Sequence, residues 1–253
     1  NEGRCIYYHD DISNKTSSIT IKNITFENAI SNIGSSIYIK GILEELTITE
    51  CIFDSNFDES NSYFFLSFYP TSFGFMNNTM ENFNGKETSY YFMYINCNNN
   101  IETLEFINIT FVNNTSNSMY GGGSGVHIEG VRELLITECN FHNNKASQES
   151  IGLSSKSFGN ELYYGNGGGF QIGYNCITNG IEITFENCIF TNNKADQHGG
   201  AISIQTTSKI TITNCTFEGN IANYRSKEGK GGSIFINPSF DFEDNECQNQ
   251  EKI

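Results

Sequence analysis

The clearest regularity in the chain is a short pattern of apolar and polar positions that returns along most of its length. It reads ITITNCTFEGN at Ile210–Asn220 and LLITECNFHNN at Leu134–Asn144, and the same frame fits residues 46–56 and 183–193. Weaker copies lie at residues 19–29, 73–83 and 104–114. The aromatic position that these copies share holds Phe26, Phe53, Met80, Phe111, Phe141, Phe190 and Phe217. Such self-similarity indicates one small structural unit used repeatedly.

A second apolar pattern alternates with the first and usually begins with glycine. Its clearest copies are Gly199–Ile204 (GGAISI), Gly231–Ile236 (GGSIFI) and Gly168–Ile172 (GGFQI). Looser copies lie at residues 34–39 and 125–128, and residues 63–68 and 90–95 occupy the same place without glycine. In both patterns apolar and polar positions alternate, which is the period of a β-strand and not of a helix.

A repeat of this size cannot bury its apolar side alone, so its copies are expected to stack. Stacked strands of successive repeats form parallel sheets, and parallel crossovers are right-handed in nearly all proteins. The predicted fold class is therefore all-β, a right-handed single-stranded parallel β-helix (β-solenoid) of about seven to eight coils. Apolar pairs such as Ile202 with Ile204 and Ile210 with Ile212 are expected to point inward.

The inward positions change phase by one residue between Ile212 and Cys215, which predicts a bend at residues 213–214. Position 214 then occupies an outer corner. The equivalent positions hold Asn23, Glu50, Asn77, Asn108, Glu138 and Asn187. Asparagine tolerates the left-handed backbone that such corners often need. Glutamate is hard to bury, which also favours an outward position.

The alternation of Phe-x-x-Asn with Gly-Gly-Ala-Ile-like runs resembles the repeat of the polymorphic outer-membrane protein family. Phe-x-x-Asn occurs at residues 53–56, 111–114, 141–144, 190–193 and 217–220. The resemblance covers most of residues 19–236, and it implies a right-handed β-helix that acts as a surface-exposed adhesin. The chain departs from the family pattern at Phe26–Ala29 and Met80–Phe83, and its first three repeats lack Gly-Gly.

The charge balance limits the partners that the chain can have. It carries 14 Lys+Arg against 29 Asp+Glu, a formal net charge of -15. Nucleic acid and anionic membranes both attract clustered positive charge, so neither is an expected partner. No run approaches the roughly 20 apolar residues of a spanning helix. The chain begins at Asn1 without a signal-like apolar run, which is typical of a processed or excised piece.

Four of the eight cysteines share one inward position of the repeat. These are Cys51, Cys139, Cys188 and Cys215. Ile24 and Ile109 fill the same position elsewhere, so a column of buried thiols is the favoured interpretation. Disulfides between stacked neighbours such as Cys188 and Cys215 remain an alternative, although their geometry would be awkward. No metal site is expected, because ligand-like cysteine spacing is absent and the histidines are scattered.

Several asparagines stand in Asn-x-Ser/Thr sequences. The glycosylation candidates are Asn14, Asn23, Asn77, Asn108, Asn113 and Asn214. Four of them occupy the predicted outer corner, so glycans there would line one edge of the rod. Asn114 also begins such a sequence, but it is the Asn of Phe-x-x-Asn and is expected to turn inward.

Many β-helices cleave acidic polysaccharides, and that chemistry needs carboxylates converging from neighbouring strands. The outward column of the glycine-led strand has none, and it reads Tyr38, Ser67, Tyr94, His127, Gln171, Ser203 and Phe235. A candidate contact face within this column is formed by Tyr38, Tyr94, His127, Gln171 and Phe235. The alternative is a plain sheet surface that faces solvent. Asp196 and His198 are expected to form a polar turn. We predict no catalytic, cofactor-binding or metal-binding residue.

Residues 1–236 are expected to form the β-helix, with an inserted loop near residues 147–166, and residues 237–253 a polar acidic tail. No capping helix is apparent at either end, and an uncapped solenoid exposes strand edges that invite other chains. End-to-end stacking of copies into a filament is one expectation, and a fragment of a longer rod is the other.

The leading hypothesis is a non-enzymatic extracellular surface or structural glycoprotein, an adhesin-like rod that reaches the cell surface by a secretory route. Its expected partners are other protein chains, including copies of itself, and glycan ligands. The alternative hypothesis is a carbohydrate-active β-helix enzyme acting on polysaccharide, which a groove with facing carboxylates would favour.

Overall fold

The computed structural model is built of strands. It describes residues 6–9, 18–27, 36–41, 43, 45–54, 64–68, 72–82, 93–116, 126–147, 167–172, 181–204, 209–222 and 231–236. Within these residues there are 24 strands and no helix. Strands of successive repeats pair in parallel, so the predicted all-β solenoid is confirmed.

The largest sheet covers two sides of the coil. The glycine-led side holds β1 (Ile6–His9), β4 (Ile37–Gly41), β7 (Phe64–Phe68) and the first parts of β10 (Met93–Ile107) and β13 (Val126–Thr137). The adjoining side holds β2 (Ser18–Lys22), β5 (Glu45–Thr49), β8 (Ser72–Met76), the later parts of β10 and β13, β17 (Glu182–Glu186) and β21 (Lys209–Thr213). The long β10 and β13 bridge both sides, with a register shift between Asn96 and Ile101.

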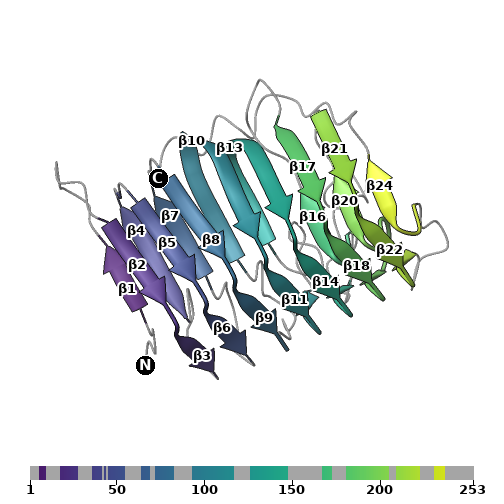
Figure 1. Cartoon of the computed structure of the whole chain (residues 1–253), viewed down its shortest axis with the longest axis horizontal. Helices are drawn as coiled ribbons and strands as arrows, with labels where there is room; N and C mark the ends of the chain where they lie inside the picture. The colour runs from purple at the N-terminus through teal and green to yellow at the C-terminus, as the bar shows by residue number, and fades with distance from the viewer. Residues whose placement is uncertain are drawn as a thin grey trace, which may run out of the picture.

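Three smaller sheets complete the coil. A seven-stranded sheet holds β3 (Thr25–Glu27), β6 (Ile52–Asp54), β9 (Thr79–Glu81), β11 (Thr110–Val112), β14 (Asn140–His142), β18 (Ile189–Thr191) and β22 (Thr216–Glu218). A four-stranded sheet holds β12 (Thr115–Ser116), β15 (Lys145–Ala146), β19 (Lys194–Ala195) and β23 (Ile221–Ala222). A three-stranded sheet holds β16 (Phe170–Ile172), β20 (Ile202–Ile204) and β24 (Ile234–Ile236). Figure 1 shows the coils side by side along the long axis of the rod, from β1–β3 to β22 and β24.

A column of stacked aromatic rings runs through the core. The ring centroids of Phe111 and Phe141 are 5.0 Å apart, those of Phe141 and Phe190 4.6 Å, and those of Phe190 and Phe217 5.0 Å. Phe26 and Phe53 stack in the same way at 4.7 Å. The strand register places these residues opposite one another, as the repeat predicts. Each stacked pair adds roughly 0.5–1.5 kcal/mol to the burial of its rings.

The predicted inward faces are also confirmed where their side chains are described. Ile37, Ile39, Ile202 and Ile204 are buried. The inward residues of the last coil, such as Ile212, are only half-buried, because no further coil covers them among the described residues.

The predicted number of coils differs from the observed one. The short strands β12, β15, β19 and β23 add a further side to the coil in four of the repeats. The solenoid therefore has about four complete turns, fewer than the seven to eight expected. The sheet from β3 to β22 nevertheless runs through seven repeats. The four closed coils all end their Phe-x-x-Asn with asparagine. In the first three repeats the described residues end before this position, at Glu27, Asp54 and Asn82.

Most of the predicted insertion and all of the predicted tail lie outside the described residues. Residues 148–166 and 237–253 are not among the described residues. Their predicted roles as loop and tail therefore remain predictions.

Candidate functional site

The outer corner between the two strands of each repeat is the best-defined candidate site. Asn23, Asn77, Asn108 and Asn214 have φ values of 56°, 56°, 52° and 52°, so all four adopt the left-handed conformation predicted for this corner. Glu50, Glu138 and Asn187 adopt it in the other repeats. All seven residues are exposed at this edge of the rod.

Backbone hydrogen bonds hold every corner except that of Asn214 against the next coil among the described residues. The Asn77 N–H donates to the carbonyl of Ile107 at 2.9 Å, and the Asn108 N–H donates to that of Thr137 at 2.9 Å. Because the backbone is satisfied in this way, the carboxamide side chains are left at the surface. Asn108 Nδ2 donates to Asn77 Oδ1 at 2.9 Å, so these two side chains touch along the edge.

The sequence Asn113-Asn114-Thr115-Ser116 contains two overlapping candidates with opposite environments. Asn113 is exposed and left-handed, with φ of 56°. Asn114 is 0% exposed, and its Nδ2 donates to the carbonyl of Met80 at 3.0 Å. The prediction that Asn114 turns inward is confirmed. The remaining candidate, Asn14, lies outside the described residues.

Asn113 belongs to a second left-handed column that the sequence interpretation missed. Its members are Asn82, Asn113, Asn143, Asn192 and Gly219. Asn143 Nδ2 donates to Asn113 Oδ1, and Asn113 Nδ2 donates to Asn82 Oδ1, both at 3.4 Å. The sequence signal for this column was the asparagine doublet in Phe-x-Asn-Asn. The sequence interpretation assigned a position in the coil only to the second asparagine of the doublet.

That second asparagine forms a buried ladder along the rod. The backbone N–H of Asn114 donates to Asn144 Oδ1 at 3.1 Å, that of Asn144 to Asn193 Oδ1 at 3.0 Å, and that of Asn193 to Asn220 Oδ1 at 3.0 Å. Each Nδ2 also reaches back to the carbonyl of the phenylalanine, or of Met80, in the preceding coil. Buried polar groups need such partners, so the ladder fixes where each coil turns.

The four cysteines of the predicted column occupy equivalent inward positions. Cys51, Cys139 and Cys188 are buried, Cys215 is half-buried, and all four are free thiols. Cys139, Cys188 and Cys215 lie on successive coils, whereas Asn78 and Ile109 separate Cys51 from them. The disulfide alternative for Cys188 and Cys215 is not realised in this structure.

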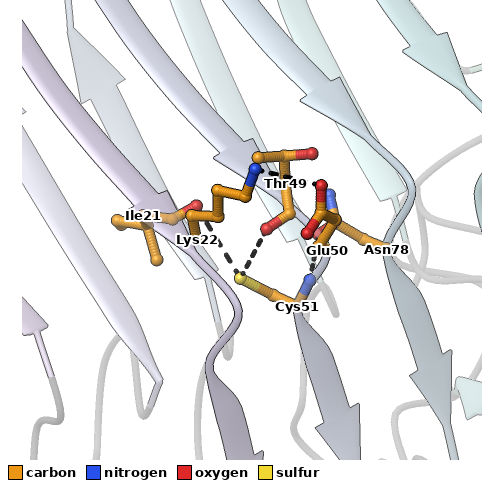
Figure 2. Close-up of polar contacts among 6 residues, drawn as sticks. All are labelled: Ile21, Lys22, Thr49, Glu50, Cys51 and Asn78. Atoms are coloured by element: carbon orange, nitrogen blue, oxygen red, sulfur yellow. Dashed lines mark hydrogen bonds and ion pairs between the residues drawn. The ribbon is translucent and has the colours of Figure 1, made fainter.

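Each thiol lies within hydrogen-bonding distance of two backbone carbonyls and can donate its one proton to either. Cys188 Sγ lies 3.2 Å from the carbonyl of Ile136 in the preceding coil and 3.3 Å from that of Glu186. Figure 2 shows the same arrangement at Cys51, whose Sγ faces the carbonyls of Thr49 and Ile21. The backbone N–H of Cys51 donates to Asn78 Oδ1 at 2.9 Å, a buried polar contact in a position otherwise held by Cys or Ile.

Burial governs the acidity of most of these thiols. Burial raises the pKa of Cys51 and Cys215, and it raises the pKa of Cys139 well above its ordinary value. A hydrogen bond from the Cys139 side chain lowers the pKa of Cys188, whose side chain is nonetheless fully buried. A reactive thiol needs both a low pKa and exposure. None of these four cysteines combines the two.

The candidate contact face is divided between two sheets. Strand pairing aligns Tyr38, Phe65, Tyr94 and His127 on one sheet, and Gln171, Ser203 and Phe235 on the other. The prediction that Ser67 belongs to this column is wrong, because Ser67 pairs with Lys40 and Asn96. The rings of Tyr38 and Tyr7 stack at 5.1 Å, which continues the aromatic column on the first sheet. The side chains of Tyr94 and His127 lie outside the description.

The second half of this face is less open than predicted. Gln171 is 2% exposed and Ser203 0%, so the expectation that they face solvent is wrong. The chain bends back at Gly167 and at Gly199. A Cβ added at Gly167 would press against Cβ of Gln171, and one added at Gly199 would press against the backbone of Ser203. The ring of His198 stacks on half-buried Phe235 at 4.5 Å. The turn that leads into each strand therefore covers its outward side.

Asp196 and His198 form a buried turn where a polar turn had been predicted. Asp196 is 1% exposed, and its Oδ2 accepts a hydrogen bond from Ser147 Oγ at 3.3 Å. In the described ranges no group of three or more His, Cys, Asp or Glu side chains could hold a metal ion. No helix in the described part of the chain is long and apolar enough to span a membrane.

Comparisons of the chain with protein-family models, with curated proteins and with solved structures returned no match. The resemblance to the polymorphic outer-membrane protein repeat therefore remains a prediction.

Proposed function

We propose that this protein is a non-enzymatic, rod-shaped glycoprotein outside the cell or at its surface, which it reaches by a secretory route. The observation that carries the proposal is the exposed edge of Asn23, Asn77, Asn108 and Asn214, each in an Asn-x-Thr sequence. A folded rod with its acceptor side chains along one edge can carry glycans without disturbing its core.

The chemistry of N-glycosylation fits these positions. The glycan bonds to the side-chain nitrogen of asparagine, so that nitrogen must be accessible and must tolerate a bulky substituent. Asn23 and Asn214 have no glycosylation candidate beside them on the adjacent described coil. Glu50 holds the corner beside Asn23, and Asn187 holds the corner beside Asn214. Asn77 and Asn108 lie on neighbouring coils about 4.8 Å apart, so two glycans there would crowd each other.

The flat sides of the rod suit contact with other molecules. In this proposal Tyr38 and the residues aligned with it contact glycans or other protein chains. Aromatic rings offer broad surface at low conformational cost, which is how many proteins bind sugars and neighbours.

The test is the glycan content and location of the protein in its own cells. Intact cells would be labelled with a membrane-impermeant biotin reagent. The recovered protein would be treated with peptide N-glycosidase in ¹⁸O water and mapped by mass spectrometry. We expect label on the protein, high occupancy at Asn23 and Asn214, lower combined occupancy at Asn77 and Asn108, and none at Asn114.

The matched control is Thr216→Ala, which destroys the acceptor sequence but leaves Asn214 and its corner in place. We expect it to remove the glycan at that position alone. Protein that is protected from the label and carries no glycan at any corner asparagine would refute the proposal.

A further inference from the structure

Two acceptor sequences for N-glycosylation overlap at the end of one repeat. Asn113-Asn114-Thr115 and Asn114-Thr115-Ser116 both have the form Asn-x-Ser/Thr. Strand pairing shows that the places of Thr115 and Ser116 are taken in the later coils by Lys145 and Ala146, Lys194 and Ala195, and Ile221 and Ala222. Among the described residues, the overlap therefore occurs in this coil alone.

The first asparagine of the overlap has room for a glycan. Asn113 is exposed, and its Nδ2 donates to Asn82 Oδ1 at 3.4 Å on the surface of the rod. A glycan replaces one of the two hydrogens on Nδ2 and leaves the other as a donor. Asn113 can therefore keep this contact while the sugar extends into solvent.

The second asparagine has no such room. Asn114 is 0% exposed, and its Nδ2 donates to the carbonyl of Met80 at 3.0 Å. Its backbone N–H donates to Asn144 Oδ1 at 3.1 Å, and its carbonyl accepts from the Lys145 N–H at 2.8 Å. Protein interiors are close-packed, so a sugar on this nitrogen leaves no space for the next coil. A chain with a glycan on Asn114 cannot close the coil here.

A modifying enzyme reaches this segment only before the coils stack. In the folded rod the Asn113 N–H donates to the carbonyl of His142 at 3.0 Å, and β12 is paired with β15. An enzyme that binds the asparagine and the hydroxyl residue of an acceptor together therefore acts on the unstacked chain, where both asparagines are accessible. Their Cα atoms are then about 3.8 Å apart, so one bulky glycan blocks the neighbouring position.

We infer that the overlapping pair is one modification site on which closure of the coil depends. A glycan on Asn113 shields Asn114 and lets the asparagine ladder form, whereas a glycan on Asn114 keeps the coil open. The inference rests on the proposed glycosylation and adds to it a role in folding. The ladder needs an unmodified carboxamide at Asn114, and the neighbouring glycan preserves it during passage through the secretory route.

Two single substitutions separate the two acceptors. Thr115→Val removes the hydroxyl that the Asn113 acceptor requires and leaves the Asn114 acceptor intact. Ser116→Ala removes the Asn114 acceptor and leaves that of Asn113. Alanine is also the residue that the later coils hold at this inward position. The double variant carries neither acceptor.

The test is to secrete the full chain and its three variants from eukaryotic cells, with a secretion signal added. Glycans would be mapped by peptide N-glycosidase in ¹⁸O water. The unaltered chain and Ser116→Ala should carry a glycan on Asn113 and be secreted equally. Thr115→Val should carry it on Asn114 in chains retained in the cell, and its secreted yield should fall several-fold because these chains do not fold.

The double variant is the control for the substitutions themselves, and its secretion should match that of the unaltered chain. All four chains made in bacteria, without glycans, should fold as judged by circular dichroism. The inference would be overturned by full secretion of Thr115→Val with a glycan on Asn114, by an unmodified Asn114 in that variant, or by poor secretion of the double variant. Glycans on Asn23 and Asn214 in those cases would leave the proposed function standing, whereas their absence would refute both proposals.

Discussion

Two asparagines in the same repeat have opposite roles, and backbone conformation separates them. Asn143 has φ of 54° and lies exposed at the second corner, whereas Asn144 is 0% exposed. An exposed left-handed residue can be exchanged for another that tolerates this conformation, and glycine tolerates it best. A buried carboxamide with several partners cannot be exchanged so easily.

Replacing Asn144 by alanine should therefore destabilise the rod strongly. The Asn114 N–H would lose its acceptor Asn144 Oδ1, and the Phe111 carbonyl would lose the donor Asn144 Nδ2. Two unsatisfied buried groups correspond to a loss of about 2–4 kcal/mol in the free energy of unfolding. Urea denaturation followed by circular dichroism would measure it.

Asn143→Gly is the neighbouring control for this substitution. It removes one exposed hydrogen bond of 3.4 Å and relieves the left-handed strain, so the free energy of unfolding should change by less than about 0.5 kcal/mol. Equal losses in both variants would mean that the ladder does not hold the coils.

The sequence predicts one of these residues better than the other. Asn114, Asn144, Asn193 and Asn220 could be placed inward because Phe-x-x-Asn fixes their distance from an inward phenylalanine. Asn143 could not, since a corner depends on the backbone conformation that the next coil imposes. Asn78 could not either, because a polar residue in an apolar column is accommodated only by its partners in the neighbouring coil. Asn78 sits in the cysteine position and accepts a hydrogen bond from Cys51, a pairing that spans 27 residues of sequence.

At the scale of elements, the glycine-led strands are packed against one another by close backbone contact. A Cβ built at Gly200 would lie 2.2 Å from the carbonyl oxygen of Gly232 and 2.5 Å from the Ile221 nitrogen. A Cβ at Gly232 would meet nothing within 4 Å, because no described coil follows it. The same glycine is thus essential in one coil and replaceable in the next.

Gly200→Ala should destabilise the protein by about 1–3 kcal/mol, because the added methyl group forces the backbones of two coils apart. Gly232→Ala should have little effect on the folded single chain. Thermal denaturation would compare the two. Equal destabilisation would show that glycine is required for backbone conformation and not for the approach of the next coil.

The sequence predicts these strands and their order, since Gly-Gly-Ala-Ile runs alternate with Phe-x-x-Asn. It does not predict that Gln171 and Ser203 are covered. Alternation assigns a residue to the outer side of a strand, but the path of the turn that precedes the strand decides whether solvent reaches that side.

At the scale of the molecule, stability in a solenoid is approximately a sum of contacts between neighbouring coils. A coil with neighbours on both sides gains two such contacts and the last coil gains one. Phe141 is stacked between Phe111 and Phe190, whereas Phe217 is stacked on Phe190 alone among the described residues. The fold could be predicted because every repeat carries the pattern. The different burial of Phe26, which is 4% exposed, and of half-buried Phe217 could not, because the two end coils have almost the same sequence.

Amide hydrogen exchange should therefore reveal a gradient along the rod. In dilute protein, the amides of β14 and β18 should exchange slowest, because opening them breaks ring stacks and ladder hydrogen bonds on both sides. The amides of β22 should exchange faster by at least about tenfold, which corresponds to about 1.4 kcal/mol of local stability. Those of β3 should be closer to the interior strands, because Phe26 is covered although it lies at the other end. Mass spectrometry of peptides spanning these strands would measure the three rates. Uniform protection would mean that the rod opens only as a whole, and equally fast exchange of β3 and β22 would mean that the two ends are alike in solution.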